Sequence, residues 1–177
     1  MRIVGLLRGI NVGKSVKAPM KELKNLLEEI GLTDVLTYLN SGNVVFSSTV
    51  PLPELQQSIQ LSLERRFGEH IPILLLEGSR VIAIRDAIPV EWGSSEAEQT
   101  YVAYLFPEVD KPSLIDELPI KRDLLQIKYV PSAFIWNIKR ENFNRSQITK
   151  ISSHESYSKM TTRNVTTARK LAELCES

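Results

Sequence analysis

The first half of the chain alternates short apolar runs with longer stretches in which apolar residues recur every three or four positions. The short runs predict β-strands at residues 4–7, 35–39, 44–47 and 71–76. The longer stretches predict two helices, one between Pro19 and Gly31 and one between Pro53 and Gly68. Proline presets the backbone of a first helical turn, and glycine commonly follows the last one. The predicted order of elements is therefore β-α-β-β-α-β.

This order is that of the ferredoxin-like unit, in which two helices cover one side of an antiparallel sheet. We expect residues 1–77 to form such a unit. Its first strand would run antiparallel to its third, so the loop after the first strand and the turn between the second and third strands would lie at the same end of the sheet. The loop at residues 9–17 is therefore predicted to neighbour the hairpin turn at residues 41–43.

The second half mixes strands and helices without a regular alternation. Strands are predicted near residues 100–106, 124–130 and 133–138, after a polar, acidic and solvated loop at residues 90–99. Helices are predicted over residues 79–88, 112–118 and 148–153, and a last one is expected to begin at Met160–Asn164 and to run to about Cys175. Residues 78–177 are thus predicted to form a second mixed α/β module. Because no low-complexity linker separates the halves, the predicted fold is α+β with two packed modules.

Composition narrows the classes of function. At 177 residues and 42% hydrophobic composition the chain can bury a proper core. No apolar run reaches the roughly 18 to 20 residues that cross a bilayer, and the first residues do not have the pattern of a signal peptide, so we expect a cytoplasmic protein that does not bind membranes. With 22 basic and 21 acidic residues, the net charge of +1 gives no global field for nucleic acid. The charge is uneven, however, because residues 1–21 hold five basic residues and no acid.

Residues that commonly carry catalysis or bind metals are few. The single Cys175 and the widely spaced His70 and His154 make neither a disulfide nor a metal set, and no nucleophile signature surrounds them. Cys175 is expected to be a packed helix residue, and the histidines to have surface or capping roles. Gly13 and Lys14 are similar to the end of a phosphate-binding loop, but three residues rather than four separate Gly9 from Gly13. The sequence predicts no metal and no cofactor, and it assigns no catalytic residue.

Polar residues suited to a looser anion site gather in three stretches, the 9–17 loop, the 41–43 turn and the 160–164 segment. Arginine and lysine supply charge, asparagine and serine orient polar atoms, and backbone amides at turns and helix starts add donors. The predicted ligand-binding residues are Arg8, Asn11, Lys14, Ser41, Asn43, Thr162, Arg163 and Asn164. Thr161 or Thr162 is expected to cap the last helix. The same glycines and asparagines could instead serve only turn geometry.

Four segments carry a resemblance to a known family. They are LLRGINVG at Leu6–Gly13, PMKELKNLLEEIG at Pro19–Gly31, YLNSGNVVF at Tyr38–Phe46 and TTRNVTTARKL at Thr161–Leu171. On these segments the chain resembles the bacterial family called domain of unknown function 1697, along essentially its whole length. The resemblance implies a two-part α+β fold and no established activity.

The function predicted from the residues is binding of a small anionic or phosphorylated ligand at the three polar stretches. An enzyme acting on a phosphate-bearing small molecule could use the same pocket. Single-stranded nucleic acid is a less favoured partner. Its bases would stack on Tyr38 and Phe46 at the surface of the sheet. In a purely structural or partner-contact role, Arg8, Asn43 and Arg163 would be buried and bonded to one another. The sequence does not determine an oligomeric state.

Overall fold

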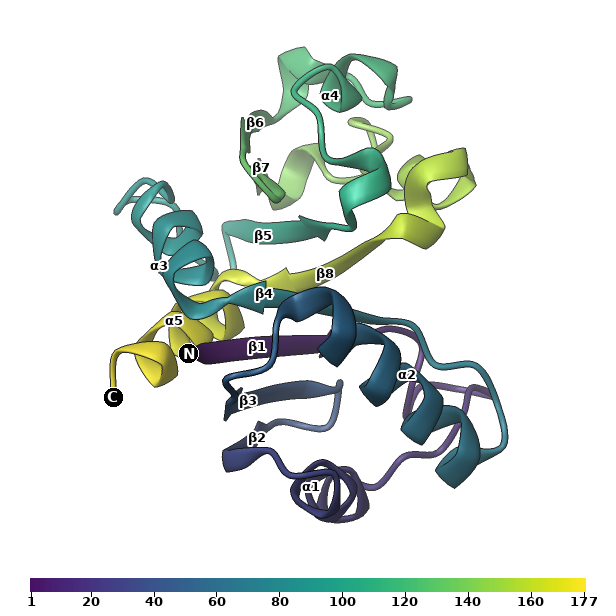
Figure 1. The fold of residues 1–177 in the computed structure, drawn as a ribbon. Coiled ribbons are helices and arrows are strands. Elements are labelled where there is room, and N and C mark those ends of the chain that lie inside the picture. The colour runs from purple at the N-terminus through teal and green to yellow at the C-terminus, as the bar shows by residue number, and fades with distance from the viewer. The chain divides into compact units, whose positions relative to one another are not determined.

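The computed structural model describes residues 1–177 and divides into two compact units (Figure 1). The first unit comprises Met1–Val81 with Glu173–Ser177, and the second comprises Ile82–Ala172. Each unit contains a four-stranded antiparallel sheet with helices, so the predicted α+β class is confirmed. The predicted division fell after residue 77, and the last five residues, predicted within the second module, group with the first unit.

The first unit contains six elements in the predicted order. They are β1 (Arg2–Leu7), α1 (Met20–Glu29), β2 (Thr33–Tyr38), β3 (Asn43–Ser47), α2 (Leu52–Phe67) and β4 (Ile73–Glu77). The strand order in the sheet is β2-β3-β1-β4, with β1 antiparallel to both of its neighbours. Because β1 and β3 run in opposite directions, the loop that leaves β1 and the turn that enters β3 lie at the same end of the sheet.

Both helices of the first unit contribute to one core on one face of this sheet. The core residues include Leu23 and Leu27 of α1 and Leu55, Ile59 and Leu63 of α2, all buried. Alternate residues of the strands complete it, among them Ile3, Leu7, Val44, Phe46 and Ile73. Burial of an aliphatic or aromatic side chain of this size contributes about 1.5–3 kcal/mol. This packing supports the loop that leaves β1 and the turn that enters β3.

The second unit is built on β5 (Glu98–Leu105), β6 (Gln126–Val130), β7 (Ala133–Lys139) and β8 (Met160–Asn164), in the sheet order β6-β7-β5-β8. Its one full α-helix is the short α4 (Leu114–Glu117), and α3 (Gly78–Asp86) and α5 (Val165–Glu176) each cross the division between the units. Five 3-10 segments join these elements: η1 (Pro107–Val109), η2 (Arg122–Leu124), η3 (Arg140–Asn142), η4 (Ile148–Ser153) and η5 (Glu155–Lys159). Its core lies on the face of the sheet that carries Ala103, Phe134 and Trp136.

The prediction that Met160–Asn164 begins the last helix is wrong. This segment is strand β8, which pairs with β5 from Leu105↔Met160 to Tyr101↔Asn164. The helix begins only at Val165, because the Asn164 side-chain oxygen accepts a hydrogen bond from the Thr167 amide at 2.9 Å. Asn164 therefore caps α5 in place of the predicted Thr161 or Thr162.

The acidic stretch at residues 90–99 is largely an exposed loop, as predicted, but it is also bonded to the sheet. Its end belongs to β5, and the Glu98 carboxylate accepts hydrogen bonds from the Gly93 amide at 3.2 Å and from Asn137 at 2.8 Å. Asn137 also donates to the Thr100 hydroxyl, which donates in turn to the Gly93 carbonyl at 2.8 Å. These bonds satisfy polar groups beside the buried Trp92, so the stretch is anchored to the sheet.

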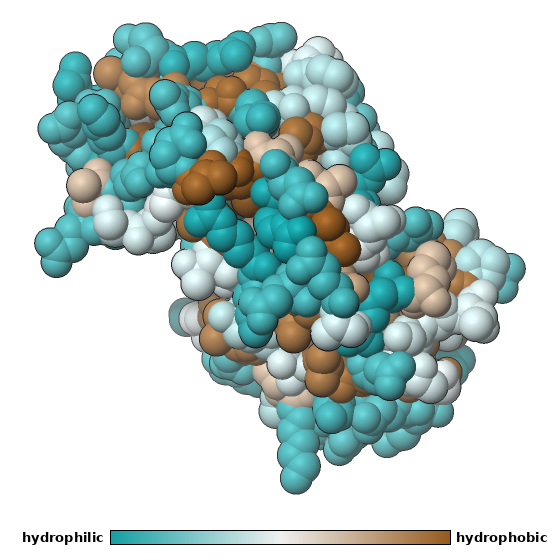
Figure 2. Space-filling model, turned by 90° about the vertical axis from the view of Figure 1, so that its left-hand side faces the viewer, coloured by the Kyte–Doolittle hydropathy of each residue, from teal (hydrophilic) through white to brown (hydrophobic).

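Apolar side chains form several separate patches among hydrophilic ones on the face drawn in Figure 2. Individual large apolar residues are exposed, among them Val12, Leu39 and Val90. None of the helices combines the length and the apolar composition that a membrane-spanning helix requires.

Candidate functional site

The loop after β1 and the hairpin turn before β3 form one structure, which we call the basic turn cluster and define as residues 8–17 and 38–43. The Asn11 side-chain amide donates to the Asn40 carbonyl at 2.9 Å and to the Asn40 side-chain oxygen at 3.2 Å. The Leu7 amide donates to the Gly42 carbonyl at 2.8 Å. The prediction that these two stretches are neighbours is therefore confirmed.

Gly42 allows the two turns to approach each other closely. Its φ is +88°, in the left-handed region, and a Cβ at this position would lie 2.7 Å from the Leu7 Cβ and 2.9 Å from the Ile10 Cδ1. Any larger residue would have to push the loop away from the hairpin. Gly9 and Gly13 also have positive φ, but a Cβ on either would meet no atom within 4 Å. Their outer side is open to an approaching molecule.

Asn11 fixes the shape of the loop. Its backbone amide donates to the Val16 carbonyl at 2.9 Å, and its side chain both donates to the Ala18 carbonyl and accepts from the Ala18 amide, at 2.9 and 2.8 Å. Together with the bonds to Asn40, these contacts use both polar atoms of the side chain. Asn11 thus holds the loop, which is a common role for asparagine at turns, and its contact with a ligand stays a prediction.

Asn43 has a comparable role in the hairpin. It is completely buried, and its side-chain amide donates to the Tyr38 carbonyl at 2.9 Å and to the Ser41 hydroxyl at 3.0 Å. A side chain without exposed surface cannot contact a ligand in this conformation. Asn43 therefore belongs to the support of the turn rather than to its outer surface.

The outer surface of the basic turn cluster carries positive charge. Arg8 is half-buried, whereas Lys14, Lys17 and Ser41 lie at more exposed positions. The Lys17 ammonium lies 3.3 Å from the Gly13 carbonyl, across the loop. The cluster contains no aspartate, glutamate or histidine. It can attract an anion, and no side chain within it neutralises that attraction.

The remaining predicted residues lie in the second unit, on strand β8. Strand alternation places Thr161 and Arg163, both buried, on one face and Met160, Thr162 and Asn164 on the other. On that second face Met160 is buried in the core, Thr162 is half-buried and Asn164 is exposed. The Arg163 guanidinium donates to the Thr161 hydroxyl at 2.7 Å and to the Thr162 carbonyl at 3.0 Å. Burial lowers the pKa of Arg163 to about 10, although nearby Tyr104 raises it. Arg163 is thus a buried, bonded residue, and a shared site of β8 with the basic turn cluster stays a prediction.

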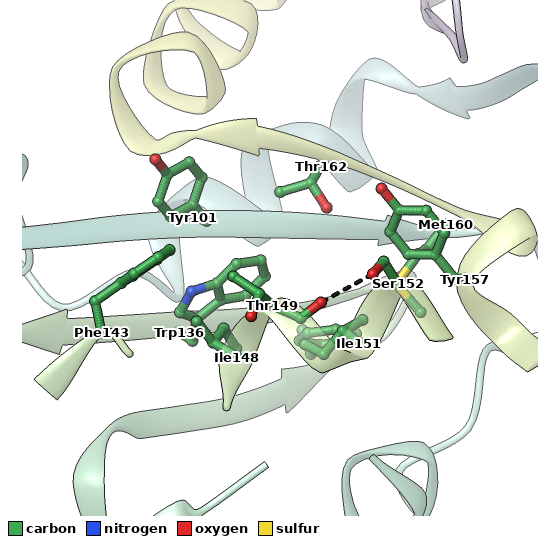
Figure 3. Close-up of a pocket in the computed structure, with 11 residues that line it drawn as sticks. Tyr101, Trp136, Phe143, Ile148, Thr149, Ile151, Ser152, Tyr157, Met160 and Thr162 are labelled. Carbon is green, nitrogen blue, oxygen red and sulfur yellow. Dashed lines mark hydrogen bonds between the residues drawn. The ribbon is translucent and has the colours of Figure 1, made fainter. Parts of the chain in front are cut away.

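The second unit contains a pocket that the sequence did not reveal, with a volume of about 330 Å³ (Figure 3). One wall is the sheet, from β5, β7 and β8, and the other is the segment at residues 143–157. We call it the aromatic pocket; its lining residues are Tyr101, Phe134, Trp136, Phe143, Ile148, Thr149, Ile151, Ser152, Tyr157, Met160 and Thr162. Thr162 is the one predicted ligand-binding residue among them.

Aromatic rings form the sheet side of this pocket. The Tyr101 and Trp136 rings are stacked, with centroids 5.4 Å apart and planes inclined by 23°. The Phe134 ring lies 5.6 Å from Trp136 at an angle of 32°. Trp136 is buried, whereas Thr149, Ser152 and Tyr157 are exposed at the opposite side, so the pocket opens to solvent.

The strand pattern contained part of the signal for this pocket. Phe134 and Trp136 are two positions apart on a predicted strand, so they had to share a face. The 143–157 segment has no regular period, because it is built from the 3-10 segments η4 and η5 and their connections. Its placement over the sheet depends on long-range packing, and sequence reasoning missed it for that reason.

The two histidines and the single cysteine of the chain have separate partners and surroundings. His70 pairs with Glu64 at 2.7 Å on the surface, and the His154 ring accepts from the Ser156 amide at 3.2 Å and caps η5, as predicted for surface and capping histidines. Burial raises the pKa of the Cys175 thiol, which reduces its thiolate fraction. No three His, Cys, Asp or Glu side chains lie together so that they could hold a metal ion.

The fold and the two candidate sites define a two-unit α+β protein with an acid-free basic loop in one unit and an aromatic pocket in the other. The chain belongs to the family described as "Protein of unknown function (DUF1697)", whose model matches residues 1–136. That match includes the basic turn cluster but ends before the 143–157 wall of the pocket.

A solved structure confirms that this fold occurs in a second protein. It is described as the structure of conserved bacterial protein SP0830 from Streptococcus pneumoniae, and it is 24% identical to this chain. The match covers 99% of this chain and 98% of that chain, with a TM-score of 0.86. At this identity the likeness shows the fold alone. Among curated proteins, none matches the chain.

Proposed function

We propose that the protein binds a small anionic ligand, such as a molecule that carries a phosphate group, at the basic turn cluster. The observation that supports this proposal is the positive charge of the cluster, which no acidic side chain within it offsets. Arg8 follows β1 directly, and Lys14 is exposed at the tip of the loop. Arginine gives charge-assisted hydrogen bonds to a phosphate, and lysine acts as a mobile point charge.

The fixed shape of the cluster lowers the cost of binding. Asn11 joins the loop to Ala18 and to the hairpin at Asn40, and Asn43 holds the hairpin itself. A loop that is already ordered loses little conformational freedom when a ligand binds. The open outer side at Gly9 and Gly13 lets an anion reach the backbone without a steric obstacle. The two asparagines therefore act through the shape of the site.

The composition of the cluster favours binding over catalysis. General acid–base chemistry needs a group that exchanges a proton near neutral pH, usually histidine or a carboxylate. The cluster has neither. The nucleic-acid alternative is weakened as well, because Phe46, one of its two aromatic residues, is completely buried in the first core.

The test is a calorimetric titration with inorganic phosphate, nucleotides and sugar phosphates at low ionic strength. Lys14→Glu should weaken binding by at least about tenfold, equivalent to 1.4 kcal/mol, because it replaces attraction by repulsion at the tip of the loop. Lys21→Glu is the matched control, an exposed lysine of the same acid-free stretch that lies on α1 outside the cluster. It should change the affinity less than twofold. Equal losses in both variants, or no binding of any of these anions, would contradict the proposal.

A further inference from the structure

We infer that the aromatic pocket is a second binding site, independent of the basic turn cluster, and that it takes a small, flat, uncharged heteroaromatic ring. The size of the pocket sets the first limit. Its volume of about 330 Å³ lies at the lower end of the range of roughly 300–1,000 Å³ found for small-molecule sites. One ring system with a short substituent fits this volume, whereas a helix or a folded partner does not.

The aromatic residues of the lining set the shape of the ligand. Tyr101, Phe134, Trp136, Phe143 and Tyr157 provide five rings around one cavity. Aromatic rings stabilise each other in offset or tilted arrangements, beyond what the burial of their area contributes. The Tyr101 and Trp136 rings already form such a stack. A flat ring in the pocket would extend this arrangement.

The polar groups of the lining set the charge of the ligand. Hydroxyl groups come from Tyr101, Thr149, Ser152, Tyr157 and Thr162, and no lysine, arginine, aspartate or glutamate lines the pocket. A hydroxyl can donate or accept a hydrogen bond, so these groups suit the N–H, ring nitrogen and carbonyl edge of a heteroaromatic ring. A charged ligand would lose water here without gaining an opposite charge. This chemistry differs from that of the basic turn cluster.

The exposed residues that η4 places beside the opening of the aromatic pocket have small side chains. Ile148 and Ile151 of η4 are buried in the second core, whereas Thr149 and Ser152 are exposed beside the pocket. The Ser152 hydroxyl donates to the Thr149 carbonyl at 2.9 Å, as Figure 3 shows. A larger apolar residue at position 152 would project into the same space and fill it.

Tryptophan fluorescence offers a direct readout. The chain has two tryptophans, Trp92 and Trp136, and only Trp136 lines the pocket. In a Trp92→Phe protein, titration with adenine or nicotinamide should change the Trp136 emission with a saturable curve. Nicotinate, which has the ring of nicotinamide with a carboxylate in place of the amide, should bind at least tenfold more weakly. Absence of a saturable change with either neutral ring would overturn the inference, and so would equal affinity for nicotinate and nicotinamide.

Matched variants locate the binding. Ser152→Leu should weaken ring binding at least tenfold, because it fills the pocket. Ser153→Leu is the control, since Ser153 is also exposed on η4 and also donates to a backbone carbonyl of that segment, but does not line the pocket. It should change the affinity less than twofold, and equal effects of the two substitutions would overturn the inference. Phosphate binding should be unchanged by Ser152→Leu and ring binding unchanged by Lys14→Glu, so that each site is tested separately.

Discussion

Substitution of Gly42 by alanine tests whether close packing of two turns builds the basic turn cluster. The new Cβ would lie 2.7 Å from the Leu7 Cβ and 2.9 Å from the Ile10 Cδ1. Overpacking of this kind costs about 1–3 kcal/mol. A residue with a side chain at φ +88° adds about 1–2 kcal/mol. The free energy of unfolding should therefore fall by roughly 2–5 kcal/mol for Gly42→Ala.

Gly9→Ala is the matched control for this prediction. Gly9 also has a left-handed φ, +73°, but a Cβ there would meet nothing within 4 Å. Gly9→Ala should therefore cost only the about 1–2 kcal/mol of a side chain in the left-handed backbone region. Part of this cost is offset, because alanine leaves the unfolded chain with less conformational entropy than glycine does. Urea unfolding followed by circular dichroism measures both variants. If the two substitutions cost the same, the loop and the hairpin are not in the close contact described here, and the reasoning is refuted.

Two further predictions concern buried groups. Arg163→Ala should lower the free energy of unfolding, measured in urea, by about 1.5–3 kcal/mol, because the hydrogen bonds of a charged group are lost. Arg163→Met should lower it less, because burial already disfavours the charge of the native arginine. A Met variant that is no more stable than the Ala variant would contradict this. Burial raises the pKa of the Cys175 thiol above its ordinary value of 9.0, so the thiol stabilises the fold below pH 9 and this contribution is lost as the pH rises further. Cys175→Ala should therefore lose less stability between pH 9 and 11 than the wild type in thermal unfolding, and identical pH profiles would refute the assignment.

The fold of the first unit could be read from the sequence because its signals are local. Apolar spacing marked α1 and α2, and Pro19 and Gly68 marked where a helix begins and another ends. The antiparallel direction of β1 and β3 then placed the loop beside the hairpin without any knowledge of side chains. Each step depended on the periods of helices and strands, which single sequences show well.

The segment around β8 could not be read in the same way. TTRNVTTARKL gives no sharp boundary, because threonine occurs both in strands and at helix starts. The boundary at Asn164 is set by its cap on Thr167 and by the pairing of Met160–Asn164 with β5. That pairing brings together residues about sixty positions apart in the chain. Local patterns do not contain such a contact.

The roles of the asparagines show a second limit. The sequence indicated Asn11 and Asn43 as site residues because an amide side chain can bind a ligand or a neighbouring backbone group equally well. The geometry shows the second use: Asn11 is bonded to Ala18 and Asn40, and Asn43 is bonded to Tyr38 and Ser41. The exposed Lys14 and Ser41 remain on the outer surface of the cluster.

The measurement that tests the central claim most directly is a titration of the isotope-labelled protein with inorganic phosphate, followed by amide NMR signals at low ionic strength. Anion binding at the basic turn cluster predicts saturable shifts of the amides of residues 9–17 and 40–42, with little change along α1 at Lys21. Shifts that never saturate, or that are as large at Lys21 as at Lys14, would show general attraction of phosphate to surface lysines and contradict the claim.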